Sequence, residues 1–181
     1  FSQLAMGTFN DVTAISKIAV NTHLAGAAGT VTGAILSRLL GGKTDVIMML
    51  NGALAGLVAI TAEPLAPTPG FAIVIGSIGS VIMYFGTKML ENFGLDDVVG
   101  AIPVHMFAGV FGTLVVPLTN KSTAFSTQFI GTLSVCAFSF VLSYIIFKSM
   151  KATIGLRISK EAEKLGTDKA EVGVVAYAIR D

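Results

Sequence analysis

The feature that most constrains the fold of this chain is a series of long segments without Asp, Glu, Lys or Arg. A helix of about 20 apolar residues, within a range of about 17 to 25, crosses hydrocarbon about 30 Å thick. Five segments meet this requirement, at residues 18–37, 46–62, 70–87, 98–120 and 122–147. Charges, prolines and glycines fill the breaks between them. The sequence therefore predicts an all-α fold, a polytopic membrane helix bundle of five spans.

Composition supports a membrane location and excludes several classes of function. The chain is 53% hydrophobic and 13% charged, whereas soluble domains are about 25% charged. A net charge of +1 lacks the basic surface of nucleic-acid-binding proteins, so lipid is expected as a partner and nucleic acid is not. The single cysteine, Cys136, offers neither a disulfide framework nor a metal-ligand pattern and is expected to be a small core residue. We expect no metal, no cofactor and no enzyme activity.

The two ends of the chain differ in what they suggest. The N-terminal residues show no signal-peptide pattern and no initiator methionine, which suggests that the chain begins partway into something longer. The stretch "SKEAEKLG" in the tail predicts a short helix that ends at a glycine.

The positions of the basic residues predict the orientation, because Lys and Arg are retained on the cytoplasmic side of a membrane. One end of the bundle would carry most of them, namely Arg38, Lys43, Lys88, Lys148, Lys151 and Arg157, and the other would carry Lys17 and Lys121. We therefore expect a transmembrane part at residues 1–150 and a cytoplasmic tail at residues 151–181. Asp96 and Asp97 would then lie at the cytoplasmic end of the fourth span.

One histidine lies deep in the fourth apolar segment. His105 follows Asp97 by eight residues, or about 12 Å along a helix. An ionisable residue in hydrocarbon is costly and marks a transport pathway or a buried partner. Neutral imidazole offers one hydrogen-bond donor and one acceptor, which suits proton relay or recognition of a small polar molecule. A hydrogen bond to a neighbouring helix is the structural alternative.

Four other residues, three within the apolar segments and one directly before the fourth segment, have ordinary structural interpretations. His23 lies near the outer end of the first segment, where an interfacial histidine is unremarkable. Asp97 directly precedes a helix, which a carboxylate can cap. Asn51 needs an interhelical hydrogen-bond partner. Pro103 removes one backbone hydrogen bond two residues before His105 and is expected to kink the helix there.

Four blocks of sequence are specific enough to suggest a family. They read "VNTHLAGAAG", "LNGALAGLVAITAEPLAPTP", "DDVVGAIPVHMFAGVFGTL" and "GLRISKEAEKLG". In this order and spacing they closely resemble the C-terminal half of the Amt/Mep/Rh ammonium transporters. The resemblance implies eleven spans, built as two inverted repeats of five helices plus a last long helix, in a homotrimer with a pore in each subunit. This chain would be the second inverted repeat, the last long span and the tail, and the N-terminal half of the same transporter would be its partner.

The resemblance also implies roles for individual residues. In the family, two histidines, one from each repeat, line a narrow hydrophobic pore and share a proton. His105 matches the second of this pair, while His23 does not replace the first. Asp97 matches the aspartate that caps and orients the histidine-bearing helix.

Further positions match the outer vestibule and the pore wall of the family. Ser2 corresponds to a serine that holds ammonium in the vestibule, although Phe1 stands where glycine is usual. Ala101 and Leu54 correspond to small or apolar residues of the pore wall.

The function implied is ammonium transport, with deprotonation in the vestibule and proton relay through the histidine pair. Deprotonation avoids much of the large cost of moving a hydrated cation into apolar surroundings. The protein would lie in the cell (inner) membrane. Its tail would contact a neighbouring subunit and be read by a PII-type signalling protein, although Lys160 and Val172 replace a common acidic residue and a common histidine.

Two alternatives remain open. One is an ammonium sensor with an Amt-like body and little net flux. The other, which ignores the resemblance, is a haem-binding membrane anchor with His23 and His105 as axial ligands.

Overall fold

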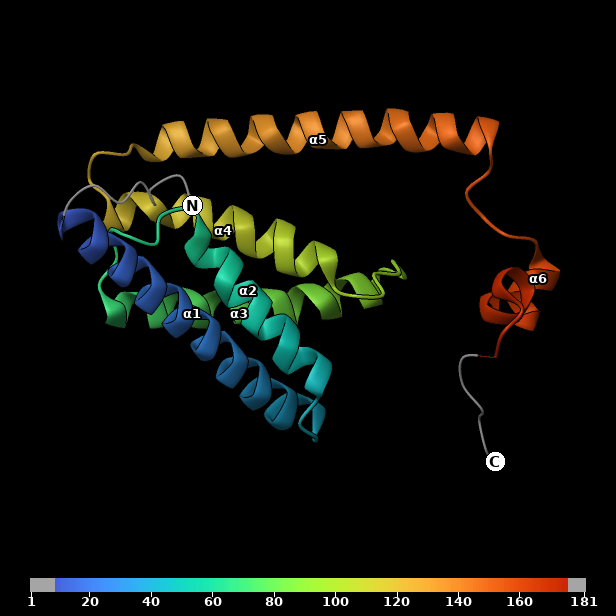
Figure 1. Cartoon of the computed structure of the whole chain (residues 1–181), viewed down its shortest axis with the longest axis horizontal. Coiled ribbons are helices and arrows are strands. Elements are labelled where there is room, and N and C mark those ends of the chain that lie inside the picture. The colour runs from blue at the N-terminus through green and yellow to red at the C-terminus, as the bar shows by residue number, and fades with distance from the viewer. Residues whose placement is uncertain (1–8, 176–181) are drawn as a thin grey trace. The chain divides into compact units, whose positions relative to one another are not determined.

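The computed structural model describes residues 9–175, which contain helices and no strands. The helices are α1 (Phe9–Gly41), α2 (Val46–Thr61), α3 (Pro69–Asn92), η1 (Ile102–Phe107), α4 (Ala108–Thr119), α5 (Phe125–Thr153), α6 (Lys160–Leu165) and η2 (Asp168–Val172) (Figure 1). By internal contacts the chain divides into two units, the first ending at Leu133 and the second beginning at Ser134. The predicted all-α class is confirmed.

All five predicted spans form helices, although their lengths differ from expectation. Four helical segments are long and apolar enough to cross a membrane, namely α1, α3, Ile102–Thr119 and α5, while α2 is a shorter apolar helix of 16 residues. The last span, α5, is long, with 29 residues, although α1 is longer still, with 33 residues. The difference arises because α1 already includes Phe9, well before the first uncharged segment.

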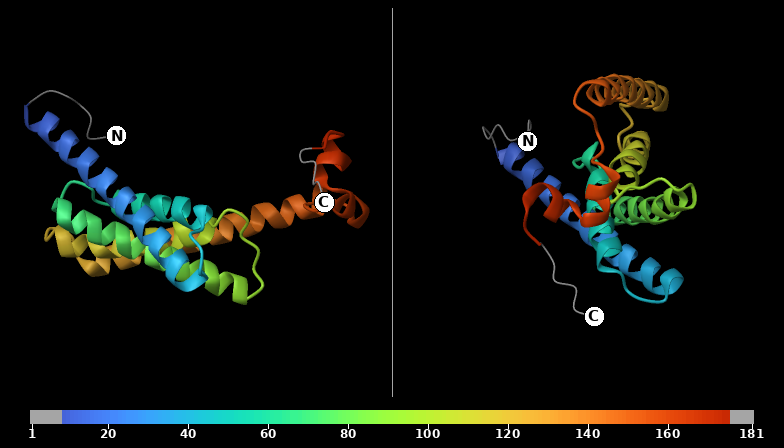
Figure 2. Two further views of the ribbon diagram at one scale, coloured as in Figure 1. Left: turned by 90° about the horizontal axis from the view of Figure 1, so that it is seen from below. Right: turned by 90° about the vertical axis from the view of Figure 1, so that its right-hand side faces the viewer.

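The first unit is held together by close contact between helix backbones. Helix α1 runs obliquely across α2 and α3 and contacts both (Figure 2). A Cβ atom on Gly29 would collide with the carbonyl group of Gly52, and one on Gly76 would collide with the backbone of Ala25. Small residues allow helices in lipid to approach this closely. The glycines of α1, α2 and α3 therefore fix the arrangement on which the fourth span rests.

A buried asparagine fastens the loop between α2 and α3. The Nδ2 atom of Asn21 on α1 donates to the carbonyl oxygens of Pro64 and Pro67, each at 2.9 Å. Asn21 is fully buried, so these bonds satisfy a donor that water does not reach.

The second unit contains most of α5 and the tail. Ser159 caps α6 by accepting a hydrogen bond from the Ala162 N–H at 3.1 Å, and the helix ends at Gly166, where φ is +94°. The predicted tail helix is therefore confirmed. No described residue of α5 is buried, so the predicted core position of Cys136 is wrong: its side chain is only partly covered.

Candidate functional site

His105 lies in a short π-helix, η1, that leads directly into α4. The N–H of Ala108 donates to the carbonyl oxygen of Pro103, five residues earlier, and to that of His105. Pro103 has no N–H and stands in the first turn of η1. The expected disturbance at Pro103 therefore takes the form of a widened turn that carries His105. Such π-turns are rare and are frequent at functional sites.

The residues beside His105 anchor η1 to the bundle. Val104 and Ala108 are buried and pack with Ala55 of α2 and Met83 of α3. His105 itself is exposed, and within the described residues its ring makes no hydrogen bond. A hydrogen bond to a neighbouring helix, the structural alternative for His105, thus finds no partner in this part of the chain. The imidazole belongs to a face that the first unit leaves open.

An apolar groove lies between α2 and α4, and one of its lining residues, Gly109, follows His105 by four positions. A cavity of about 280 Å³ is lined by residues of both helices, namely Val58, Thr61, Ala62, Gly109 and Thr113. The hydroxyl group of Thr61 donates to the Leu57 carbonyl at 2.6 Å, and that of Thr113 to the Gly109 carbonyl at 3.0 Å. Both hydroxyl groups thus use their protons on their own helix, which leaves oxygen lone pairs as acceptors.

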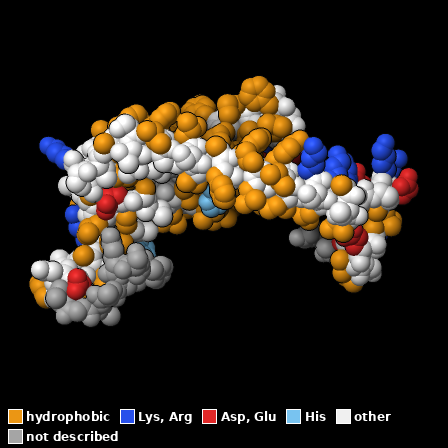
Figure 3. All heavy atoms as spheres, turned by 90° about the horizontal axis from the view of Figure 1, so that it is seen from above, with side chains coloured by type: hydrophobic (Ala, Val, Ile, Leu, Met, Phe, Trp, Pro, Cys, Tyr) orange, Lys and Arg blue, Asp and Glu red, His pale blue; other side chains and the backbone are white. Residues whose placement is uncertain are grey.

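Of the two pore-wall residues expected from the sequence, Leu54 lies on the helix face that leads into the groove. Leu54, 46% exposed, precedes Val58 by four residues, and the exposed Ala101 precedes His105 by four. Side chains four residues apart share one face of an α-helix, so Leu54 lies on the same side of α2 as Val58, whereas the π-turn of η1 lies between Ala101 and α4. The groove residue Val58 was not singled out from the sequence, but its four-residue spacing from Leu54 points to it; Gly109 was expected only as a small residue of a packing face. Figure 3 shows hydrophobic side chains, in orange, over much of the surface that faces the viewer.

Asp97 caps the helix that carries His105. Its Oδ1 accepts from the Ala101 N–H at 2.9 Å and its Oδ2 from the Ile102 N–H at 2.8 Å. These donors are four and five residues ahead, because a turn closed by Gly100, with φ of +73°, separates Asp97 from the helix. Both carboxylate oxygens therefore act on the first N–H groups of the helix.

Asn51 has a different partner from the one expected. Its Nδ2 donates to the carbonyl oxygen of Val99, in the turn before η1, at 3.1 Å. The predicted need for a hydrogen bond is met, but by a loop carbonyl and not by a neighbouring helix.

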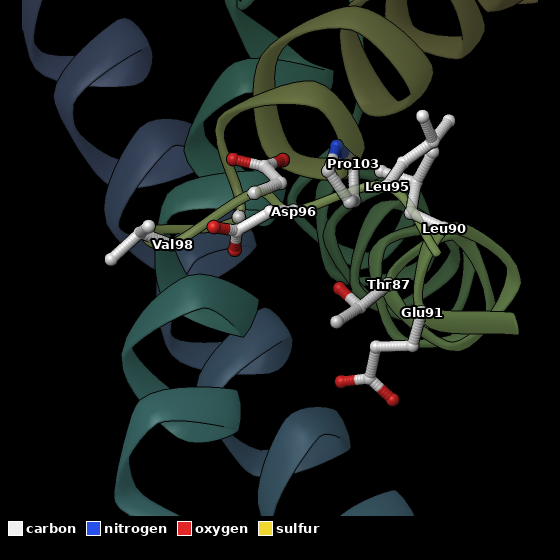
Figure 4. Close-up of a pocket in the computed structure, with 9 residues that line it drawn as sticks. Thr87, Leu90, Glu91, Leu95, Asp96, Val98 and Pro103 are labelled. Atoms are coloured by element: carbon white, nitrogen blue, oxygen red, sulfur yellow. The ribbon is translucent and has the colours of Figure 1, made fainter. Parts of the chain in front are cut away.

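A second cavity, of about 240 Å³, lies beside the same turn (Figure 4). Thr87 and Glu91 come from α3, Asp96 from the loop, and Pro103 from η1. Glu91 is paired with Lys88 at 2.9 Å. His105 is among the lining residues of neither this cavity nor the groove between α2 and α4.

The remaining candidate residues lie elsewhere. His23 is exposed on α1, with its Nδ1 2.7 Å from the carbonyl oxygen of Ala19 in its own helix. Within the described residues α1 contacts neither η1 nor α4, so no contact unites the two histidine-bearing helices and the haem alternative gains no support. Residues 9–175 contain no group of three His, Cys, Asp or Glu that could hold a metal. Ser2 lies outside the described residues.

Comparison with known proteins identifies the family. The family model described as the Ammonium Transporter Family matches residues 4–177. Ammonium transporter Amt2 of Archaeoglobus fulgidus is 40% identical over 90% of this chain and 39% of its own length. Ammonium transporter Amt1 of Methanocaldococcus jannaschii is 34% identical over 96% of this chain and 45% of its own.

The fold agrees with this relationship. A solved structure titled "Sensor Amt Protein" superposes with a TM-score of 0.82 at 30% identity, over 91% of this chain and 43% of that one. The chain thus spans less than half the length of the relatives it matches. The resemblance inferred from the four sequence blocks is confirmed, and the relatives bear the names of transporters and not of enzymes. With its apolar helices, the chain is a multi-pass membrane protein and belongs to the Ammonium Transporter Family.

Proposed function

We propose that this chain forms half of a pathway that carries ammonium, as ammonia, across a membrane. Family membership supports the substrate, because the relatives are named ammonium transporters. The observation that carries the proposal is the exposure of His105 on a wide turn beside an apolar groove. An unpaired imidazole facing lipid would be unfavourable, so a second half of the transporter is expected to cover this face and supply a second histidine.

The residues of the open face suit the passage of a small neutral molecule. Apolar walls at Leu54, Val58 and Ala101 would exclude the hydrated cation, because moving a charge into apolar surroundings is costly. Ammonium would first lose its proton at an outer vestibule that includes Ser2. Ammonia would then cross the apolar bore. His105 would accept the proton on one ring nitrogen while the other releases a proton to its partner histidine.

The remaining parts of the assembly follow from the same proposal. In transporters built from inverted repeats, the site lies between the repeats, which agrees with an open His105 face. The protein would form a homotrimer in the cell (inner) membrane, with the transmembrane part at residues 1–150. The tail at residues 151–181 would lie in the cytoplasm, where a PII-type protein would read it.

A sensor with little net flux is the second candidate, favoured by the likeness to the structure titled "Sensor Amt Protein". The two functions differ in one measurable quantity, the net movement of ammonium. Flux into liposomes that contain the purified full-length protein separates them: sustained uptake supports the transporter, and binding without uptake supports the sensor.

The test of the histidine site compares two variants in the full-length protein. His105→Ala is expected to abolish ammonium uptake in transport-deficient cells, or to change its mode, without reducing the amount of protein in the membrane. His23→Ala is the matched control, because that exposed ring bonds only to its own helix, and it should transport like the wild type. Wild-type rate and selectivity in His105→Ala would contradict the relay role.

A further inference from the structure

The turn before η1 is held by contacts of two kinds. Local contacts come from Asp97, whose carboxylate caps the helix and whose carbonyl oxygen accepts from the Gly100 N–H at 3.1 Å. These bonds join residues at most five positions apart, so they fix the shape of the turn and the start of η1. They do not determine where the turn lies relative to α2.

Asn51 provides the contact from outside the turn. Its side chain on α2 is 8% exposed and donates to the Val99 carbonyl oxygen at 3.1 Å. The amide also packs against the next residue, because a Cβ on Gly100 would lie 2.6 Å from the Asn51 Nδ2. Glycine at position 100 therefore permits both the positive φ of the turn and the approach of Asn51.

This contact links the two walls of the proposed pathway. Helix α2 carries Asn51 and, one turn later, Leu54, while the turn that Asn51 holds leads into η1 and His105. Packing between α2 and η1 also includes an apolar cluster that contains Met48 and Ala55 of α2 and Val104 of η1, and apolar contacts are not directional. A hydrogen bond weakens steeply with distance and angle, so the Asn51 bond restricts the depth and rotation of η1.

We infer that Asn51 is a positioning residue, which holds the turn before η1 so that His105 stands at the correct place beside the α2 wall. The inference rests on the proposed function, because the position of His105 matters only if its ring relays protons. Proton transfer between two rings requires hydrogen-bond distances, and a displacement of about 1 Å reduces the rate of such a step by up to about 100-fold.

The test is Asn51→Asp in the full-length protein, since the carboxylate keeps the shape of the side chain and removes its donor. Asn21→Asp is the matched control, because Asn21 is also buried and donates to two loop carbonyls far along the chain from His105. Initial rates of ammonium uptake, normalised to transporter in the membrane, give Vmax and KM. We expect Asn51→Asp to lower Vmax about tenfold with KM unchanged, and Asn21→Asp to keep the wild-type Vmax.

A second pair of variants guards against misfolding. If the buried carboxylate prevents insertion, Asn51→Leu and Asn21→Leu remove the donors without adding a charge, and the same difference in Vmax is expected. Wild-type Vmax in the Asn51 variants, or an equal loss in the Asn21 variants, would overturn the inference while His105→Ala remains inactive. Wild-type uptake in His105→Ala would instead overturn the proposed function, and the inference with it.

Discussion

Replacement of Asp97 tests how the histidine-bearing helix is held at its start. Asp97→Ala removes two acceptors at once, because each carboxylate oxygen accepts one backbone N–H. Asp97→Asn keeps one oxygen but places an NH₂ group against the other N–H donor. At an ordinary N-cap asparagine is about as favourable as aspartate, whereas the two-bond geometry of Asp97 predicts an intermediate effect for Asp97→Asn.

The magnitudes follow from these two bonds. Loss of a capping side chain costs about 0.5–2 kcal/mol, and the two-bond cap at Asp97 belongs in the upper half of that range, at about 1.5–2 kcal/mol for Asp97→Ala. Asp97→Asn loses one bond and the favourable interaction of a charge with the helix dipole, which is about 0.3–1 kcal/mol. Its total cost should be about 1 kcal/mol.

The assay is the temperature at which half of the detergent-solubilised full-length protein is no longer monodisperse, read by size-exclusion chromatography. Asp96→Ala is the control, since this neighbouring carboxylate lines the acidic cavity and accepts neither of the cap bonds. The expected order of stability is wild type and Asp96→Ala, then Asp97→Asn, then Asp97→Ala. An equal loss of thermal stability in Asp97→Asn and Asp97→Ala would show that the charge of Asp97 is what matters. Wild-type stability of Asp97→Asn would refute the two-bond cap.

Three further predictions concern other parts of the chain. Gly29→Ala should destabilise the protein by about 1–3 kcal/mol, because the added Cβ would collide with the α2 backbone. Gly109→Ala is the control and should be tolerated in the same thermal assay, because its Cβ would make only an ordinary contact of 3.5 Å. Arg157 donates to Glu163 and holds the pKa of that carboxyl below its usual 4.5. The pair should therefore stabilise the tail above pH 4.5 and stop doing so as the pH falls through the lowered pKa. Amide exchange in α6 should become faster over that pH range. Residues 1–181 expressed alone should give neither a monodisperse particle nor flux in liposomes, and co-expression with the N-terminal half should restore both; a flux-competent particle from residues 1–181 would contradict the half-pathway proposal.

The helices of this protein could be predicted from sequence because lipid imposes a length and an apolar composition on each span. The same constraint explains why their ends were less predictable: α1 already includes Phe9, in a stretch where polar residues interrupt the apolar pattern but do not interrupt a helix. Pro103 signalled a disturbance in the fourth span, but whether a proline produces a kink or a widened turn depends on the neighbouring helices. The chemistry of the site was readable from His105, yet its exposure depends on how Val104 and Ala108 pack.

The partner of Asn51 could not be predicted from local pattern. A buried amide needs a hydrogen bond, and the sequence therefore indicated that a partner exists. Its identity depends on the fold bringing Val99, 48 residues away in sequence, to the side of α2. By contrast, the bonds of Asp97 span at most five residues, and the capping role was accessible from sequence for that reason.

The π-turn at η1 also sets the angular register between the two halves of the fourth span. Each residue advances an α-helix by about 100°, so one extra residue in a turn rotates everything before it relative to everything after it. Deleting a single residue within Ile102–Phe107 would restore α-helical spacing and turn the upstream side chains by about 100° against α4. In an alignment of relatives, a one-residue gap at this place would therefore mark a change in the direction of the histidine, even where every other residue of the block is identical.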